Sequence, residues 1–229
     1  VFIKDEYEDL PIITDALEAM APDAPLLHPN VAEYKGLLHK IETPSNVFVA
    51  LHWKKGEVQE GFHQSDVVIE NTFTVPAVHQ AYIEPHSSLV RLNPDGTADI
   101  WSSNKSPFAL RDQVGNALQV APANLIVHPC YVGGDFGAKG DGNDVALCYA
   151  LAKKSGRPVK LVVDYTEELT AGNPRHGAVI QVKTGVKKNG ILIAQHVQFI
   201  FDSGAYGASR PQGFLVGAHD APGPYRVPN

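Results

Sequence analysis

The stretch VHPCYVGGDFGAKGDGNDV, residues 127–145, is the part of the sequence best suited to chemistry. It holds five glycines between Gly133 and Gly142, with an apolar run before it and a helix-like sequence after it. Unshielded backbone N–H groups at the start of a helix suit an anionic or oxo-bearing ligand. A tight turn that needs positive φ angles is the structural alternative, and for an isolated glycine loop it is the more frequent explanation.

Two nucleotide-binding motifs fail at this loop. A P-loop requires Gly-x-x-x-x-Gly-Lys-Ser/Thr, whereas Lys139 is preceded by Ala138 and followed by Gly140. The dinucleotide fingerprint Gly-x-Gly-x-x-Gly is met only in its first half by GDGNDV. The loop therefore calls for a different ligand, or for none.

The composition is that of a globular protein with a real core. The chain has 229 residues, of which 44% are hydrophobic and 19% charged, and its net charge of −6 argues against a nucleic-acid or anionic membrane surface. No apolar run is long enough to span a membrane, and the start, VFIKDEYEDLP, does not resemble a signal peptide. Because it also lacks an initiator Met, we expect an excerpt of a longer chain. Cys130 and Cys148 are expected to be two buried free thiols in a reducing, cytoplasmic compartment rather than a disulfide.

Residues 1–45 are expected to form a connecting segment from a preceding domain. They are rich in Pro, Ala and acidic groups, and one short helix is predicted from Thr14 to Met20, with Asp15 in its first turn. Pro22, Pro25 and Pro29 then interrupt regular structure.

The remaining chain predicts an α+β fold, with a mixed sheet, long hairpins and a few packed helices. Pro94-Asp95-Gly96 and Asn189-Gly190 mark the two hairpin turns. Strands are predicted at 47–53, 67–75, 124–132 and 158–166, and in the two arms of each hairpin, 87–103 and 178–202. Helices are predicted at 110–120, despite Gly115, and at 144–156, with Asn143 or Asp144 as its N-cap.

Beyond the loop, much of the chain resembles the molybdopterin-binding large chain of the xanthine oxidase/aldehyde oxidase family of molybdenum hydroxylases. The run Gly-Gly-x-Phe-Gly-x-Lys is followed by GRPVK and by Arg175-His176. The segments VFIKDEYEDLP, QAYIEPHSSLV, VAPANLIVHP, FDSGAYG and GPYRVPN also resemble family segments in the family's order. The resemblance implies that residues 46–229 are the first part of the molybdenum-binding domain.

That resemblance implies a molybdenum–molybdopterin cofactor and the oxidation of an aldehyde or a heteroaromatic C–H with oxygen from water. It also implies 2Fe-2S and FAD groups on other domains or subunits of an oligomeric complex. In the matching family loop, the backbone around the Phe-Gly pair lies against the oxygen ligand of the metal. The cofactor-binding residues expected here are Gly134, Asp135, Phe136, Gly137 and Ala138, with no residue ligating the metal directly.

Three positions depart from the family pattern. Asp135 replaces a frequent glycine, and its carboxylate would repel an oxo group unless it is paired or points away. Gly140 replaces the glutamate that contacts substrate in purine-oxidising members, which argues against such a purine. Lys105 aligns with a glutamine that hydrogen-bonds a molybdenum oxygen, and we expect it either to donate there as a charge or to be a solvated hairpin end.

No catalytic residue is expected in these 229 residues, because the family's general-base glutamate lies near the far end of a much longer chain. Glu84, Glu167 and Glu168 are poor substitutes, and TEEL predicts the first turn of a helix capped by Thr166. The histidines form no compact ligand set, so ordinary polar or core roles are expected. Arg175 and His176 are expected to be structural or to line the approach to the site.

Two functions remain open from the sequence. The first is part of a molybdenum hydroxylase that is inactive alone and that binds the remainder of the molybdenum-binding chain. The second is a non-catalytic paralogue or scaffold, in which Asp135 and Lys105 would mark lost cofactor binding. A third possibility, an unrelated small anion binder, has less support because the family likeness includes the loop itself.

Overall fold

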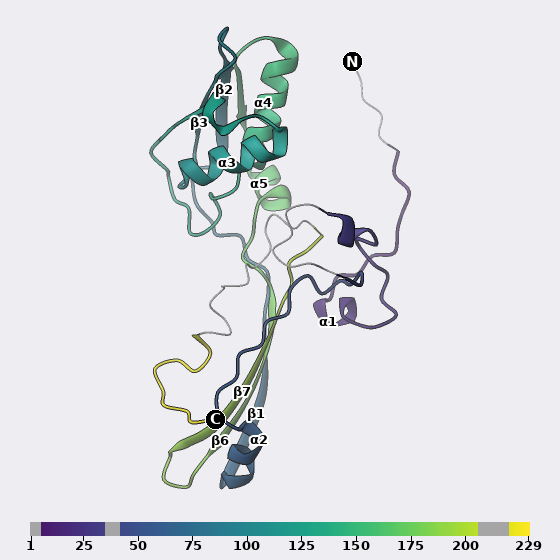
Figure 1. The fold of residues 1–229 in the computed structure, drawn as a ribbon, viewed down its shortest axis with the longest axis vertical. Coiled ribbons are helices and arrows are strands. Elements are labelled where there is room, and N and C mark those ends of the chain that lie inside the picture. Colours follow the sequence, from purple (N-terminus) through teal and green to yellow (C-terminus); the bar gives the residue numbers. More distant parts are fainter. Residues whose placement is uncertain (1–5, 35–41, 206–219) are drawn as a thin grey trace. The chain divides into compact units, whose positions relative to one another are not determined.

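The computed structural model describes residues 6–34, 42–205 and 220–229 (Figure 1). It contains two compact units, which are considered separately: unit 1, Val1–Pro76 with His176–Asn229, and unit 2, Ala77–Arg175. The expectations for the first five residues and for the last two of FDSGAYG lie outside the described residues.

Unit 2 is a four-stranded mixed sheet with the order β4-β3-β2-β5. Its strands are β2 (Ser87–Leu92), β3 (Ala98–Ser102), β4 (Leu125–His128) and β5 (Val159–Val162). The predicted β2–β3 hairpin is present, and Asp95 closes its turn by accepting a hydrogen bond from the Thr97 amide while Gly96 takes a φ of 86°. Strand β4 pairs parallel to β3, so the chain must cross over between them.

The crossover is α3 (Pro107–Leu118), and α4 (Asn143–Ser155) follows the glycine loop. Both helices pack against the sheet (Figure 1). They bury one continuous apolar cluster, made of Val90, Ala98, Ile100, Leu110, Val114, Leu125, Val145, Cys148, Tyr149 and Ala152. This core fixes the end of β3, the end of β4 and the start of α4, which are the points from which the glycine loop is held.

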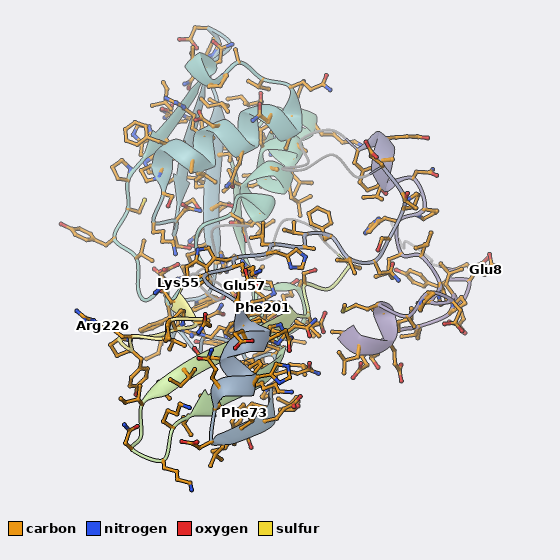
Figure 2. All side chains as sticks on the ribbon, turned by 60° about the horizontal axis from the view of Figure 1, so that its bottom comes forward. Glu8, Lys55, Glu57, Phe73, Phe201 and Arg226 are labelled. Carbon is orange, nitrogen blue, oxygen red and sulfur yellow. The ribbon has the colours of Figure 1, made fainter. Side chains whose placement is uncertain are left out.

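Unit 1 is built on the second long hairpin. Its three-stranded antiparallel sheet has the order β1-β6-β7, with β1 (Val67–Val75), β6 (Ala178–Val186) and β7 (Leu192–Phe201). Helix α2 (Val58–Gln64) packs on β6 and β7. Every residue of β1 is exposed, and the apolar side chains of Phe73 on β1 and Phe201 on β7 are both accessible (Figure 2).

The short elements complete the described chain. They are α1 (Ala16–Ala19), α5 (Tyr165–Ala171), and the 3₁₀ turns η1 (Val31–Glu33) and η2 (Pro122–Asn124). Asp15 is the N-cap of α1, with its carboxylate accepting from the Leu17 and Glu18 amides, rather than a first-turn residue.

The predicted α+β fold class, with its mixed sheet and long hairpins, is confirmed, but several boundaries were wrong. Residues 47–53 form no strand, because residues 47–52 line a hollow beside β7 instead of pairing with that strand. Strand β4 ends at His128, before Pro129, which has no amide to donate to a ladder. Helix α4 has Gly142 as its N-cap, one residue before the predicted Asn143.

Candidate functional site

The glycine loop leaves β4 and enters α4, and its backbone is unusual for a chain of L-residues. Positive φ angles occur at Gly134 (95°), Phe136 (49°) and Gly137 (103°). The turn explanation therefore holds for two of the glycines. It does not cover Phe136, for which the left-handed conformation costs about 1–2 kcal/mol. Backbone strain of this kind gathers at functional sites, because surrounding contacts must maintain it.

Asp135 is the organising side chain of the loop. Its Oδ1 accepts from the Lys139 amide at 2.6 Å, and its Oδ2 accepts from the Gly137 amide at 2.9 Å. Oδ2 also receives the Lys105 ammonium at 2.7 Å. Burial raises the pKa of the Asp135 carboxyl, but the bonds from Lys105 and the two amides outweigh it and leave that pKa below its usual value. The carboxylate is thus paired, as the sequence required for any anionic ligand nearby.

Three consecutive backbone amides of the loop do not donate a hydrogen bond within the described part of the chain. Among the described residues, the N–H groups of Gly134, Asp135 and Phe136 have no hydrogen-bond partner. A side chain built at Gly137 would meet nothing within 4 Å, so the loop is open there. Successive unshared amides beside left-handed residues are the type of donor set that binds an anion or an oxo group. The donor set and the open backbone fit the oxo-bearing cofactor that the resemblance implies.

The other predicted site residues lie around this donor set. Ala138 is fully buried, and its amide donates to the Asp135 carbonyl at 3.0 Å, so it shapes the loop rather than facing a ligand. Lys105 follows β3, and its amide donates to the Lys139 carbonyl at 3.0 Å. A Cβ at Gly140 would approach Lys105 Cε to 3.3 Å. The structure thus brings all the predicted loop residues and Lys105 together.

A second carboxylate anchors the loop from the other side, and the sequence did not reveal it. Glu84 Oε2 accepts from the Gly133 amide and from the Lys139 ammonium, each at 2.7 Å. The Lys139 side chain is fully buried, and its ammonium lies 4.8 Å from the centre of the Tyr82 ring. No local pattern indicates a pairing across 55 positions, so the sequence showed only a lysine within the motif and a distant glutamate, with nothing to connect them.

Tyr82, which contacts the Lys139 ammonium, also belongs to a polar network with Glu168 and His86. The Glu168 carboxylate accepts from the Tyr82 hydroxyl at 2.5 Å and from the His86 amide. Burial raises the pKa of Glu168, but these hydrogen bonds prevail and lower it, so the side chain stays charged. Burial and the Glu168 charge raise the pKa of Tyr82, which stays a neutral donor. Glu168 is therefore a structural carboxylate.

The remaining residues singled out in the sequence make the following contacts. Helix α5 is capped by Asp164, which forms a capping box with Glu167, so the prediction of Thr166 as the cap was wrong by two residues. The Arg175 backbone bridges to Val78, and His176 Nδ1 lies 3.0 Å from the Asp202 carbonyl. Within the described part of the chain, no cluster of His, Cys, Asp or Glu could hold a metal ion.

Residues 38–229 match the family described as the molybdopterin cofactor-binding domain. The chain belongs to this family. The match covers the glycine loop, Glu84, Lys105 and both sheets. The resemblance noted from the sequence is therefore confirmed, and the cofactor of the family is molybdopterin.

The curated relatives are much longer than this chain. It is 30% identical over 227 residues to a probable xanthine dehydrogenase subunit of Bacillus subtilis, covering 99% of this chain and 29% of that protein. It is 28% identical over 224 residues to the nicotinate dehydrogenase large molybdopterin subunit of Eubacterium barkeri, covering 98% and 49%. The chain thus spans less than half of either relative.

Solved structures share the fold. The aldehyde oxidoreductase of Desulfovibrio desulfuricans superposes with a TM-score of 0.73 at 24% identity, over 84% of this chain and 20% of that one. The CO dehydrogenase of Oligotropha carboxidovorans gives a TM-score of 0.72 at 23% identity, over 85% and 24%.

Proposed function

We propose that this chain is part of a molybdenum hydroxylase that oxidises an aldehyde or a heteroaromatic C–H with water as the oxygen source. In this proposal, residues 46–229 form the first part of the molybdopterin-binding domain and residues 1–45 connect it to a preceding domain. The observation that carries the proposal is the row of three unshared amides, Gly134 to Phe136, in a loop that the family match includes. When bound, the molybdenum cofactor would supply the redox centre and the site of oxygen transfer.

The residues of this chain would bind and orient the cofactor. The N–H groups of Gly134, Asp135 and Phe136 are placed to donate to an oxo group, and as fixed dipoles they stabilise its charge at little reorganisation cost. Gly137 keeps the backbone open, because any side chain there would also meet an unfavourable φ of 103°. Gly140 leaves the space beside Lys105 without a carboxylate, which supports a substrate other than a purine bound by a glutamate at this position.

Catalysis would need residues that these 229 do not supply. Two of the carboxylates near the loop, Glu84 and Glu168, are occupied by Lys139 and by Tyr82 and His86. Neither is free to take a proton from a reacting group. The general base is therefore assigned to the remainder of the molybdenum-binding chain, and 2Fe-2S and FAD groups to other domains or subunits of an oligomeric complex.

The sheet of unit 1 supports docking of that remainder. On β7 the Gln195 amide bonds Asn229 outside the sheet, whereas the Asp202 amide points to Gly177 beside β6. Amides alternate along a strand, so those of Val197, Phe199 and Phe201 point to the free edge. Among the described residues none of the three has a partner across that edge. An unpaired edge and an exposed β1 favour coverage by further polypeptide.

No helix in the described ranges is long and apolar enough to cross a membrane. Cys148 is the buried free thiol that we expected, whereas Cys130 is exposed, so the expected burial of Cys130 was wrong. A cytoplasmic location is inferred from these unpaired thiols, since disulfides persist in oxidising compartments.

The test is the molybdenum and pterin content of the natively expressed protein, isolated with the polypeptides that co-purify. Equimolar molybdenum and pterin are expected, with pterin measured by fluorescence after release. A metal-free, well-folded complex from a host that loads a control hydroxylase would overturn the proposal. That outcome would favour the scaffold alternative, whose one supporting observation is that Lys105 and Asp135 are bonded to each other.

A further inference from the structure

The three positions at which the chain departs from the family pattern are neighbours in space. Lys105 Nζ lies 2.7 Å from Asp135 Oδ2, across 30 positions of sequence. A Cβ at Gly140 would lie 3.3 Å from Lys105 Cε and 3.9 Å from its Nζ. The lysine therefore bonds the added carboxylate and passes over the glycine, so the three replacements belong to one arrangement.

Lys105 holds the loop at two points. Its backbone amide donates to the Lys139 carbonyl, and its ammonium bonds the Asp135 carboxylate. Asp135 in turn accepts from the amides of Gly137 and Lys139. One side chain thus captures two of the loop's amides, and a second side chain from the end of β3 holds the first in place.

The hydrogen bonds within the loop determine which of its amides are still available to donate to a ligand. Gly137 and Lys139 donate to Asp135, Gly133 donates to Glu84, and Ala138 donates to the Asp135 carbonyl. The amides of Gly134, Asp135 and Phe136 remain. If the Asp135 carboxylate released its two amides, the positive-φ turn at Gly137 would lose its restraint and the three remaining amides would lose their fixed positions.

Charge explains why the lysine is needed. A carboxylate beside an anionic or oxo-bearing ligand is repulsive, and this one is charged, since its hydrogen bonds keep its pKa low despite burial. The Lys105 ammonium cancels that charge at 2.7 Å. An amide at position 105 could bond Asp135 but could not neutralise it.

We propose that Lys105 and Asp135 are a positioning pair, in which Asp135 restrains the Gly137 turn and Lys105 neutralises Asp135 so that the Gly134–Phe136 amides face an oxo-bearing ligand. Lys105 then acts through Asp135 and not by donating to the ligand itself. The proposal rests on the proposed function for the ligand it serves, but the restraint on the loop is a property of this chain alone.

The first experiment measures amide hydrogen exchange in the 229-residue chain without cofactor. The variants are Lys105→Gln, Asp135→Gly and the double variant. Asp135→Gly is expected to speed exchange at Gly137 and Lys139 by about tenfold, the loss of a charged acceptor, and Lys105→Gln by a smaller factor. The control Lys54→Gln removes an ion pair to Glu57 of similar length elsewhere and leaves both amides unchanged. Exchange of β2 and β3 amides verifies that each variant is folded.

The second experiment measures the pterin and molybdenum retained by the same variants in the co-purified complex. Lys105→Gln leaves a carboxylate without its cation, so it is expected to retain less than the double variant Lys105→Gln/Asp135→Gly, in which both charges are gone. The double variant also lacks the Asp135 restraint on the Gly137 turn, so it is expected to retain less than the wild type. A merely structural ion pair gives no such rescue, because the double variant would then retain no more than the worse single variant. Absence of rescue, or unchanged exchange at Gly137 and Lys139 in Asp135→Gly, overturns the positioning pair.

The two proposals fail in distinguishable ways. A wild-type complex without molybdenum and pterin overturns the proposed function. It also removes the ligand that the positioning pair would serve, whereas the exchange measurement still tests whether Asp135 restrains the loop. A loaded wild-type complex whose variants show neither effect overturns the positioning pair and leaves the proposed function in place.

Discussion

Individual side chains hold the glycine loop in place, because their carboxylates accept hydrogen bonds from backbone amides of the loop. Asp135 binds it from within, and Glu84 binds it from the strand side through Gly133 and Lys139. Each carboxylate is paired with one lysine, so two cations and two anions balance each other around the loop. The Phe136 conformation is strained, and these four side chains supply the contacts that maintain it.

The Glu84–Lys139 contact is expected to behave as a buried ion pair. Glu84→Gln leaves the fully buried Lys139 ammonium without a carboxylate and should lower the free energy of unfolding by about 2–3 kcal/mol. The double variant Glu84→Gln/Lys139→Met should recover much of that loss, because no charge is then left buried. Urea denaturation of the wild type, the single variants Glu84→Gln and Lys139→Met, and the double variant gives the coupling energy between the two side chains. Additive losses in the double variant would show that the two side chains stabilise the loop independently.

At the scale of elements, helix α3 shows how packing reverses a local preference. Gly115 was a reason to doubt this helix, since glycine is about 1 kcal/mol less favourable than alanine in a helix interior. The structure explains the residue: an added Cβ would lie 2.8 Å from the Val120 carbonyl oxygen and 3.5 Å from Pro122 Cγ. The chain turns back at the helix end, where Gln119 takes a left-handed conformation and the Val120 amide bonds the Gly115 carbonyl.

Gly115→Ala is therefore expected to destabilise the protein by about 1–3 kcal/mol, although propensity alone predicts a gain. The clash is with backbone, which cannot rotate away as a side chain tip would. Thermal or urea unfolding of the variant shows whether the free energy of unfolding falls or rises. Gln119→Gly, at the left-handed position of the same turn, is the matched change and should stabilise by about 0.5–1 kcal/mol. A stabilised Gly115→Ala variant would contradict the packing described for α3.

At the scale of the whole molecule, the two units differ in how much they bury. The apolar cluster of the structure lies within unit 2, between its sheet and α3 and α4. In unit 1 the strand β1 is exposed along its entire length, and the outer edge of β7 lacks a partner among the described residues. Burial of apolar surface is the main source of stability, so unit 2 has the greater capacity to fold without help.

Hydrogen exchange should show this difference in the isolated chain. Amides of β2 and β3 are expected to be strongly protected, those of β1 weakly, and those of Val197 and Phe199 on the β7 edge least of all. Binding of the co-purifying polypeptide should raise protection on β1 and β7 and leave β2 and β3 unchanged. Hydrogen exchange measured by mass spectrometry, on the chain alone and in the complex, tests both expectations. Full protection of β1 and β7 in the isolated chain would remove the support for docking at this sheet.

The sequence by itself determined the family, the α+β class, both hairpins and the position of the loop. These depend on local signals: Pro94-Asp95-Gly96 and Asn189-Gly190 set turns through their own φ preferences, and the Gly-Gly-x-Phe-Gly-x-Lys run is contiguous. It failed at residues 47–53, where an apolar run indicated a strand, because a strand also needs a neighbour that sequence periodicity does not reveal.

Only the tertiary structure decided how the loop is held. From the sequence, Asp135 and Lys105 were two separate departures from the family pattern, whereas in space they neutralise each other at 2.7 Å. Glu84 lies 55 positions before Lys139, and Tyr82 lies 86 before Glu168, so none of these pairings leaves a local pattern. Which carboxylates are structural and which amides stay available depends on distances between side chains, and those are set by the packing of β3, β4 and α4 around a shared core.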